Sequence, residues 1–146
     1  MRVIEKSEYR GEDGAISLEN RLRGTLKYGL RWHGEMQAQE LATQMLGKML
    51  GDEHVLLRNL LLPGAATAVP LILIGPQGVR VLVASPVRGN FRAKLDQWLA
   101  FDGQSRRFKR ARPNLQAIAL SMAQDVLHLV QGQGYDLPEV EAVLVF

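Results

Sequence analysis

The fold is decided by residues 69–89, "VPLILIGPQGVRVLVASPVRG". Two apolar runs, over roughly 69–75 and 79–85, flank "GPQG", and the proline and glycines of that tetrapeptide predict a tight turn. Nearly every position in both runs is apolar, without the alternation of a strand that faces water on one side. The stretch therefore predicts a hairpin of two strands that are buried on both faces of a sheet.

The segments on either side predict helices and further strands. Residues 34–51 carry an apolar stripe with helical period, and residues 54–62 favour a strand. After Gly89 a more polar hairpin is expected to turn at Asp102-Gly103. A second helix is expected over 113–131, opened by Pro113, followed by a last strand, "VEAVLVF". This order favours an α/β fold in which a mixed sheet carries helices on both faces. The stripe of the first helix consists of Ala38, Leu41, Ala42, Met45 and Met49.

The N-terminal 33 residues differ from the rest of the chain. Residues 1–15 are polar and predict a loose arm, and a leucine recurs at every fourth position from Leu18 to Leu30, which predicts an amphipathic helix. We therefore expect an arm and helix over 1–33 and a globular domain over 34–146. The leucine stripe favours docking onto the parent domain or a second copy of the chain, and the alternative is a membrane surface.

Composition excludes several classes of protein. Among 146 residues there is no cysteine, which excludes disulfides, thiolate metal sites and cysteine nucleophiles and fits a cytoplasmic location. No apolar run is long enough to span a membrane. The net charge is only +3, but residues 54–124 hold ten Lys or Arg and two acids, Asp96 and Asp102. This basic middle favours a surface that faces phosphates, and the alternative is a solvated surface.

The densest part of the basic region is "RRFKRARP" at 106–113, where five cations surround Phe108. Cations suit phosphates, and an aromatic ring suits a stacked base. In a strand, alternation places Arg107 and Lys109 on the face opposite Phe108, so the five cations cannot all contact one ligand. An alternative is an edge strand that its charges protect from aggregation. The candidate contacts to DNA or RNA are Arg106, Arg107, Phe108, Lys109, Arg110 and Arg112.

From Gly34 to Phe146 the order of several motifs resembles the nuclease-related domain (NERD) family, a branch of the PD-(D/E)xK endonuclease-like superfamily. The resemblance rests on "GEMQA", "LRNLLLP", "LILIGPQGVRVLVASPVRG", Trp98 with "FDGQ", "PNLQ" and "AVLVF". It implies a restriction-endonuclease-like core of helix, three strands, helix and strand. It also implies DNA cleavage by one or two divalent cations, usually Mg²⁺, that carboxylates hold.

The family's metal-binding positions are occupied by unsuitable residues here. Its Asp falls on Pro70, its Glu on Val83 and its Lys on Ser85. Proline and valine cannot bind a hard cation, and serine cannot supply a positive charge. No Asp or Glu occurs anywhere from His54 to Leu95, so a shifted alignment does not restore the site.

Two other family positions are matched. Glu35 falls on a helix-borne Glu, and Gln116 falls on the Gln of an "NPxxQ" motif whose Asn is Arg112 here. Glu35 also fits the ordinary preference for acids in the first turn of a helix. The resemblance therefore implies a vestigial site at Glu35, Pro70, Val83, Ser85 and Gln116, without catalytic residues, a metal or a cofactor.

Three hypotheses for function follow. The first is a catalytically inactive NERD-like domain that binds nucleic acid or a protein partner. The second is a structural module that dimerises through the leucine stripe and a sheet edge. The third is an active nuclease with migrated acids, in which Glu35 and either Asp96 or Asp102 hold Mg²⁺ or Mn²⁺. His33, His54 and His128 show no metal-ligand spacing.

Overall fold

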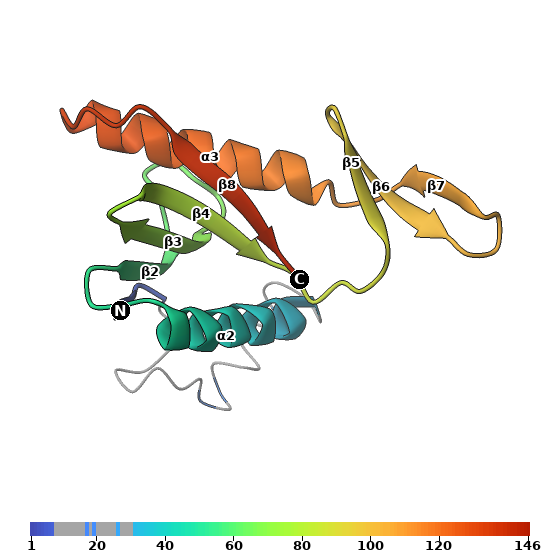
Figure 1. The fold of residues 1–146 in the computed structure, drawn as a ribbon, viewed down its shortest axis with the longest axis horizontal. Coiled ribbons are helices and arrows are strands. Elements are labelled where there is room, and N and C mark those ends of the chain that lie inside the picture. The colour runs from blue at the N-terminus through green and yellow to red at the C-terminus, as the bar shows by residue number, and fades with distance from the viewer. Residues whose placement is uncertain (8–16, 18, 20–25, 27–30) are drawn as a thin grey trace.

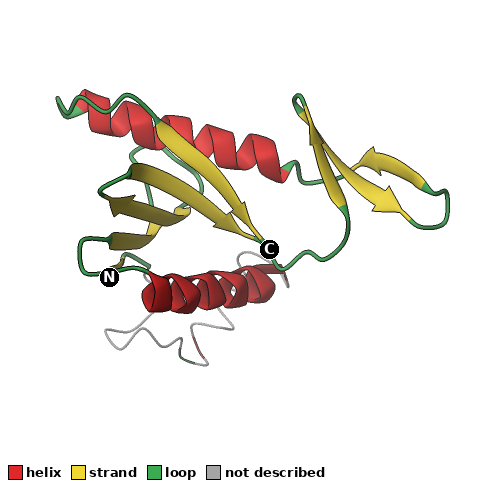
Figure 2. Ribbon diagram, in the orientation of Figure 1, coloured by secondary structure: helices red, strands yellow, loops and turns green. Residues whose placement is uncertain are grey.

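The computed structural model describes residues 1–7, 17, 19, 26 and 31–146. The predicted leucine-striped helix, and with it the dimerisation surface proposed for it, falls largely outside these residues. Figure 1 shows the arrangement of the described elements, and Figure 2 shows their type. The elements are β1 (Arg2–Glu5), α2 (Arg31–Met49), β2 (Val55–Leu60), β3 (Val69–Gly75), β4 (Gly78–Ala84), β5 (Phe91–Lys94), β6 (Gln97–Asp102), β7 (Arg107–Arg110), α3 (Leu115–Gly132) and β8 (Val140–Val145).

Five strands form the main sheet, in the order β1-β2-β3-β4-β8. The strand β3 is antiparallel to both of its neighbours, β2 and β4, whereas β1 is parallel to β2 and β8 is parallel to β4. The helix α3 makes the crossover that a parallel β4–β8 pair needs. The helices α2 and α3 lie on opposite sides of the sheet (Figure 1). The expected mixed sheet with a helix on each face is confirmed.

The hairpin of residues 69–89 forms the centre of this sheet, as predicted. Leu71 pairs with Leu82 and packs in the layer against α2, whereas Ile72 pairs with Val81 and packs in the layer against α3. All four side chains are buried. The turn lies between Gly75 and Gly78, and the φ angle of +110° at Gly78 explains the glycine there. Burial on both faces accounts for the unbroken apolar runs.

The apolar stripe expected on the first helix is only partly buried. Ala42 packs against the sheet, with Ala38 and Leu46 beside it, but Leu41 and Met45 are 59% and 53% exposed. Met49 is also exposed. Ala38, Ala42 and Leu46 therefore face the sheet, whereas Leu41, Met45 and Met49 face away from it. The predicted helix is confirmed, but three of the five residues of its predicted stripe lie outside the core.

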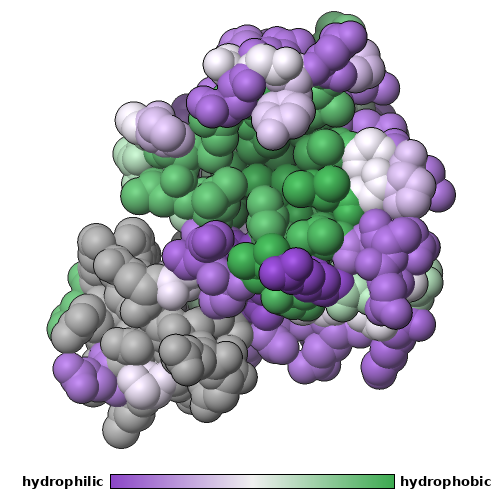
Figure 3. Space-filling view, turned by 90° about the vertical axis from the view of Figure 1, so that its left-hand side faces the viewer, coloured by the Kyte–Doolittle hydropathy of each residue, from purple (hydrophilic) through white to green (hydrophobic). Residues whose placement is uncertain are grey.

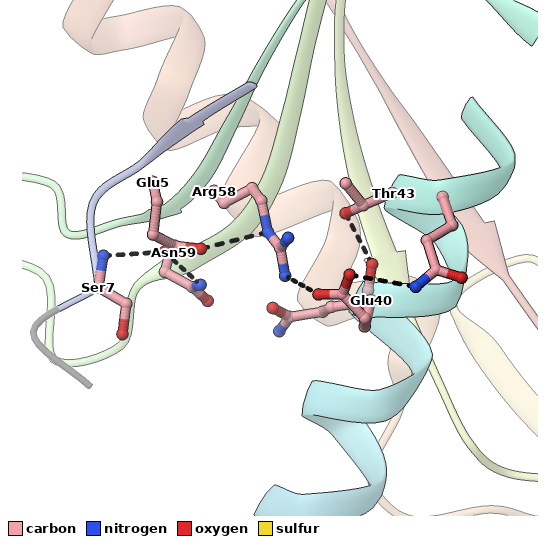
Figure 4. A network of polar contacts seen from close by, with 8 residues as sticks. Glu5, Ser7, Glu40, Thr43, Arg58 and Asn59 are labelled. Carbon is pink, nitrogen blue, oxygen red and sulfur yellow. Dashed lines mark hydrogen bonds and ion pairs between the residues drawn. The ribbon is translucent and has the colours of Figure 1, made fainter. Parts of the chain in front are cut away.

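We expected residues 1–15 to form a loose arm. Residues 2–5 instead form the edge strand β1. Glu5 of β1 contacts Arg58 of β2, with Oε2 to Nε 3.3 Å apart, and Arg58 Nη2 donates to Glu40 of α2 at 3.1 Å (Figure 4). Asn59 Nδ2 donates to Glu5 Oε1 at 2.9 Å, and so does the backbone N–H of Ser7. Arg58 is only 5% exposed. This network joins two strands and a helix, which explains how so polar a segment enters the sheet.

The polar segment after Gly89 forms three strands, so the predicted hairpin is present as β6 and β7, but the prediction lacks the additional strand β5. The small sheet has the order β5-β6-β7, and all its pairs are antiparallel. The expected turn after Asp102 is present, but a further turn at Leu95 and Asp96 separates β5 from β6. The next helix, α3, begins at Leu115 after the N-cap Asn114, and not at Pro113.

The two ends of the molecule differ in character. The small sheet lies at one end of the main sheet, beside Phe146 (Figure 1). The opposite end faces the viewer in Figure 3, and apolar side chains gather in the middle of that view. No helix within the described part of the chain is long and apolar enough to cross a membrane.

Candidate nucleic-acid interface

The small sheet has two faces of different composition, which its register defines. Arg92 pairs with Leu99, which pairs with Arg110, so these three side chains share one face. Phe101 pairs with Phe108 on that same face. We call this face the outer face. By alternation it carries Arg92, Lys94, Gln97, Leu99, Phe101, Phe108, Arg110 and Arg112.

The opposite, inner face fastens the small sheet to the main sheet. The rings of Phe91 and Trp98 stack with centroids 5.2 Å apart, and Phe146, just after β8, stacks 6.0 Å from Trp98. The three rings are within 13° of parallel. Trp98 is only 7% exposed. Because the inner face is held in this way, the outer face is directed away from the stack.

The turn between β5 and β6 is held by side chains at the start of α3. Asn114 Nδ2 donates to the carbonyl of Asp96 at 2.8 Å, and Gln116 Nε2 donates to the carbonyl of Leu95 at 3.1 Å. Asn114 also caps the helix, since its Oδ1 accepts from the N–H of Ala117 at 3.1 Å. These bonds fix the orientation of the small sheet relative to α3. They also give Gln116 a structural task.

Four cations of the outer face are exposed and have no carboxylate partner among the described residues. They are Arg92 and Lys94 of β5, Arg110 of β7 and Arg112 just after it. Between Gly89 and Arg112 the sequence holds seven cations and two acids. Arg110 and Arg112 also line a small open pocket of about 210 Å³. The cations lie on the two sides of β6, whose outer-face residues Gln97, Leu99 and Phe101 are uncharged.

The two acids of this segment form no ion pair with the cations of the outer face, although Asp96 lines the same small pocket as Arg110 and Arg112. Asp96 lies in the turn between β5 and β6. Asp102 is paired on the inner face, where Lys109 contacts its Oδ2, Ser105 Oγ donates to Oδ2 at 2.8 Å and the N–H of Gln104 donates to Oδ1 at 3.0 Å. Lys109, and after it Ser105 and Gln104, hold the pKa of Asp102 well below its usual range.

Two aromatic rings lie at one end of the outer face. Phe101 and Phe108 meet edge to face, with centroids 5.4 Å apart and planes at 62°. The guanidinium carbon of Arg92 lies 4.4 Å from the centroid of Phe108, at cation–π distance. Phe101 is 42% exposed. The ring of Phe108 thus lies between Arg92 and Phe101, whereas the ring of Phe101 is exposed to solvent.

The structure divides the basic cluster predicted from the sequence. Phe108, Arg110 and Arg112 belong to the outer face, whereas Arg107 and Lys109 belong to the inner face. Arg106 lies in the turn before β7 with a φ angle of +50°. The division agrees with the expectation that the five cations cannot share one ligand.

Sequence analysis missed the contribution of β5 and β6, namely Arg92, Lys94 and Phe101. The sequence does contain a pattern that indicates this strand, because the cations Arg92 and Lys94 alternate with the uncharged residues Phe91 and Ala93. This pattern can be assigned to a separate strand only when the position of the turn at residues 95–96 is known. That turn contains no glycine, and Leu95 itself takes the positive φ of +54°.

The five positions of the implied nuclease site lie at one end of the main sheet. Pro70 near the start of β3 and Val83 near the end of β4 are adjacent because the two strands are antiparallel. Ser85 follows β4, and its N–H donates to the carbonyl of Val145 at 2.9 Å. Glu35 is exposed near the start of α2, on the opposite side of the sheet from the layer in which Val83 packs.

The residues that could hold a metal ion are dispersed. In the described ranges, no three His, Asp or Glu side chains gather in an arrangement suited to a cation. His54 is buried beside Glu53, with Nδ1 3.2 Å from Oε1, and His33 packs against Trp32. His128 lines a shallow pocket between α3 and the β2–β3 loop.

Comparison of this chain with models of protein families, with curated proteins and with solved structures finds no match.

Proposed function

We propose that this chain is a catalytically inactive, nuclease-related domain that binds nucleic acid through the outer face of the small sheet. The observation that carries the proposal is the pair of cation columns on that face. Arg92 and Lys94 on one side and Arg110 and Arg112 on the other are exposed, and no described carboxylate pairs with them. Phosphates are the partners that would offset this charge, and each contact would release counterions.

The nuclease-related part of the proposal rests on element order and on the hairpin. The order α2, β2, β3, β4, α3 and β8 is the order that the NERD resemblance implies for a restriction-endonuclease-like core. The end of that core where cleavage chemistry would be expected carries Pro70, Val83 and Ser85. A retained core that lost its carboxylates would leave binding as the remaining activity, on a different surface.

A salt-dependent titration tests the binding. Fluorescence anisotropy of a labelled DNA oligonucleotide is measured at several salt concentrations. The logarithm of the binding constant is expected to fall linearly with the logarithm of the salt concentration. Replacing Arg92 and Arg110 together by Ala should reduce that slope by about 2, since each phosphate contact contributes about 1.

Arg107→Ala is the matched control, because Arg107 lies on the inner face of the same strand as Arg110. It should leave the slope within about 0.3 of that of the unchanged protein, because a contact contributes about 1. Failure to bind DNA or RNA at low salt, or equal losses in both variants, would overturn the proposal.

Incubation of plasmid DNA with the protein and Mg²⁺ or Mn²⁺ tests the proposal that the domain is catalytically inactive. The plasmid should stay supercoiled. Nicking that Glu35→Gln abolishes would contradict inactivity and would support the migrated-acid hypothesis instead.

A further inference from the structure

We infer that the outer face takes single-stranded rather than duplex nucleic acid, with one base stacked on Phe101. This inference rests on the proposed function and specifies its ligand. The cations of the outer face account for phosphate binding but do not distinguish one strand from two. The distinction comes from the uncharged outer-face side chains of β6 that lie between them.

The central column of the outer face consists of Phe101, Leu99 and Gln97, all on β6. It is flanked by Arg92 and Lys94 of β5 and by Arg110 of β7 with Arg112 after it. Neighbouring strands lie about 4.8 Å apart, and residues on one face of a strand repeat about every 6.7 Å. Leu99 therefore lies between Arg92 and Arg110, and Gln97 lies opposite Lys94, whereas Phe101 lies opposite Phe108 at the end of the column.

This pattern suits a strand whose bases are unpaired. A single strand can lay its bases along the central column while its phosphates meet the flanking cations. A duplex presents its charged backbones and keeps its bases stacked inside, so it would set phosphates against Phe101 and Leu99. Removing phosphates from water against apolar side chains is unfavourable.

Phe101 is the ring that the geometry prepares for stacking. It is 42% exposed, and its position is supported from the side by Phe108, whose ring lies at 62° to it. Arg92 occupies one face of Phe108, at 4.4 Å from its centroid. Phe108 thus acts as a support, and Phe101 remains accessible to a base.

The test uses one labelled oligonucleotide of about 12 nucleotides, within the ~4–16 nucleotide range of known single-strand sites. It is titrated alone, annealed to its complement, and as an abasic strand of equal charge. The unchanged protein should bind the single strand about tenfold more tightly than the duplex. Phe101→Ala should weaken single-strand binding about tenfold and should leave duplex binding and abasic-strand binding unchanged.

Phe101→Tyr keeps the ring and should retain single-strand affinity within about twofold, since the stacking surface is preserved. Thermal unfolding followed by circular dichroism shows whether each variant is folded. Equal or tighter binding of the duplex, with losses in the Arg92→Ala and Arg110→Ala variants, would overturn the inference and leave the proposed function standing. Failure of all three probes to bind at low salt would overturn both.

Discussion

The arginines of the main sheet and those on the outer face of the small sheet differ in whether they form ion pairs. In the main sheet Arg58 is 5% exposed and contacts Glu5 and Glu40, and Arg80 pairs with Glu141 across β4 and β8 at 2.6 Å. In the small sheet Arg92 and Arg110 are exposed, and no described carboxylate pairs with them. Under the proposed function, a charge that serves folding is paired within the chain, whereas a charge that would serve binding is left for a partner.

The largest expected effect is that of Arg58→Ala. Removing the guanidinium leaves Glu5 and Glu40 without its charge and should lower the free energy of unfolding by about 3 kcal/mol. We choose the lower end of the range for buried pairs because the Glu40 side chain is 41% exposed. Urea unfolding measures the loss. Arg92→Ala, the matched change on the small sheet, should alter stability by less than about 0.5 kcal/mol.

Two results would contradict the assignment of Arg58 to stability and of Arg92 to binding. A loss of stability in Arg92→Ala as large as in Arg58→Ala would show that the outer-face cations serve folding. Tight DNA binding by Arg92→Ala together with weakened binding by folded Arg58→Ala would show that the binding surface lies elsewhere.

A smaller effect is expected at the joint between the small sheet and α3. Asn114→Asp keeps the oxygen that caps α3 but loses the Nδ2 donor to the Asp96 carbonyl. It should cost about 1 kcal/mol, the usual net contribution of one hydrogen bond. Asn114→Ala loses the cap as well and should cost about 2 kcal/mol. Amide hydrogen exchange at residues 95–97 should increase in both variants, and unchanged exchange in both would show that the joint does not hold the turn.

The smallest effect is the pH dependence that Asp102 contributes. Its pKa in the folded protein lies below its ordinary value of 3.8, chiefly because of Lys109. The ionised pair therefore stabilises the fold above about pH 4 and loses this contribution as the pH falls below it. The melting temperature of Asp102→Asn should fall less steeply between about pH 4 and pH 2.5 than that of the unchanged protein. Identical pH profiles would show that this exposed pair does not contribute to stability.

Local chemistry was sufficient to predict the main sheet apart from its edge strand β1. The hairpin of residues 69–89 has continuous apolar runs, a glycine-rich turn and burial on both faces, so its periodicity and its tertiary role agree. The two helices were also predictable as elements. Which side of α2 faces the sheet was not, because Leu41 and Met45 satisfy the helical period as well as Ala38 and Ala42 do.

The errors lie where distant residues decide the structure. β1 depends on Arg58, which is more than fifty residues away in the chain, and no local signal in residues 1–7 reveals that partner. The turn at Leu95 and Asp96 depends on Asn114 and Gln116. Only the residues of the outer face on and after β7 were therefore predicted, from the density of charge there. Those on β5 were not predicted.

The most direct measurement is an NMR titration of the 15N-labelled protein with a single-stranded oligonucleotide. We predict that chemical-shift changes cluster on the outer face, at Arg92, Leu99, Phe101 and Arg110, while the main sheet is unaffected. Changes that instead cluster at Glu35, Val83 and Ser85, or no changes at low salt, would contradict the claim that this surface binds nucleic acid.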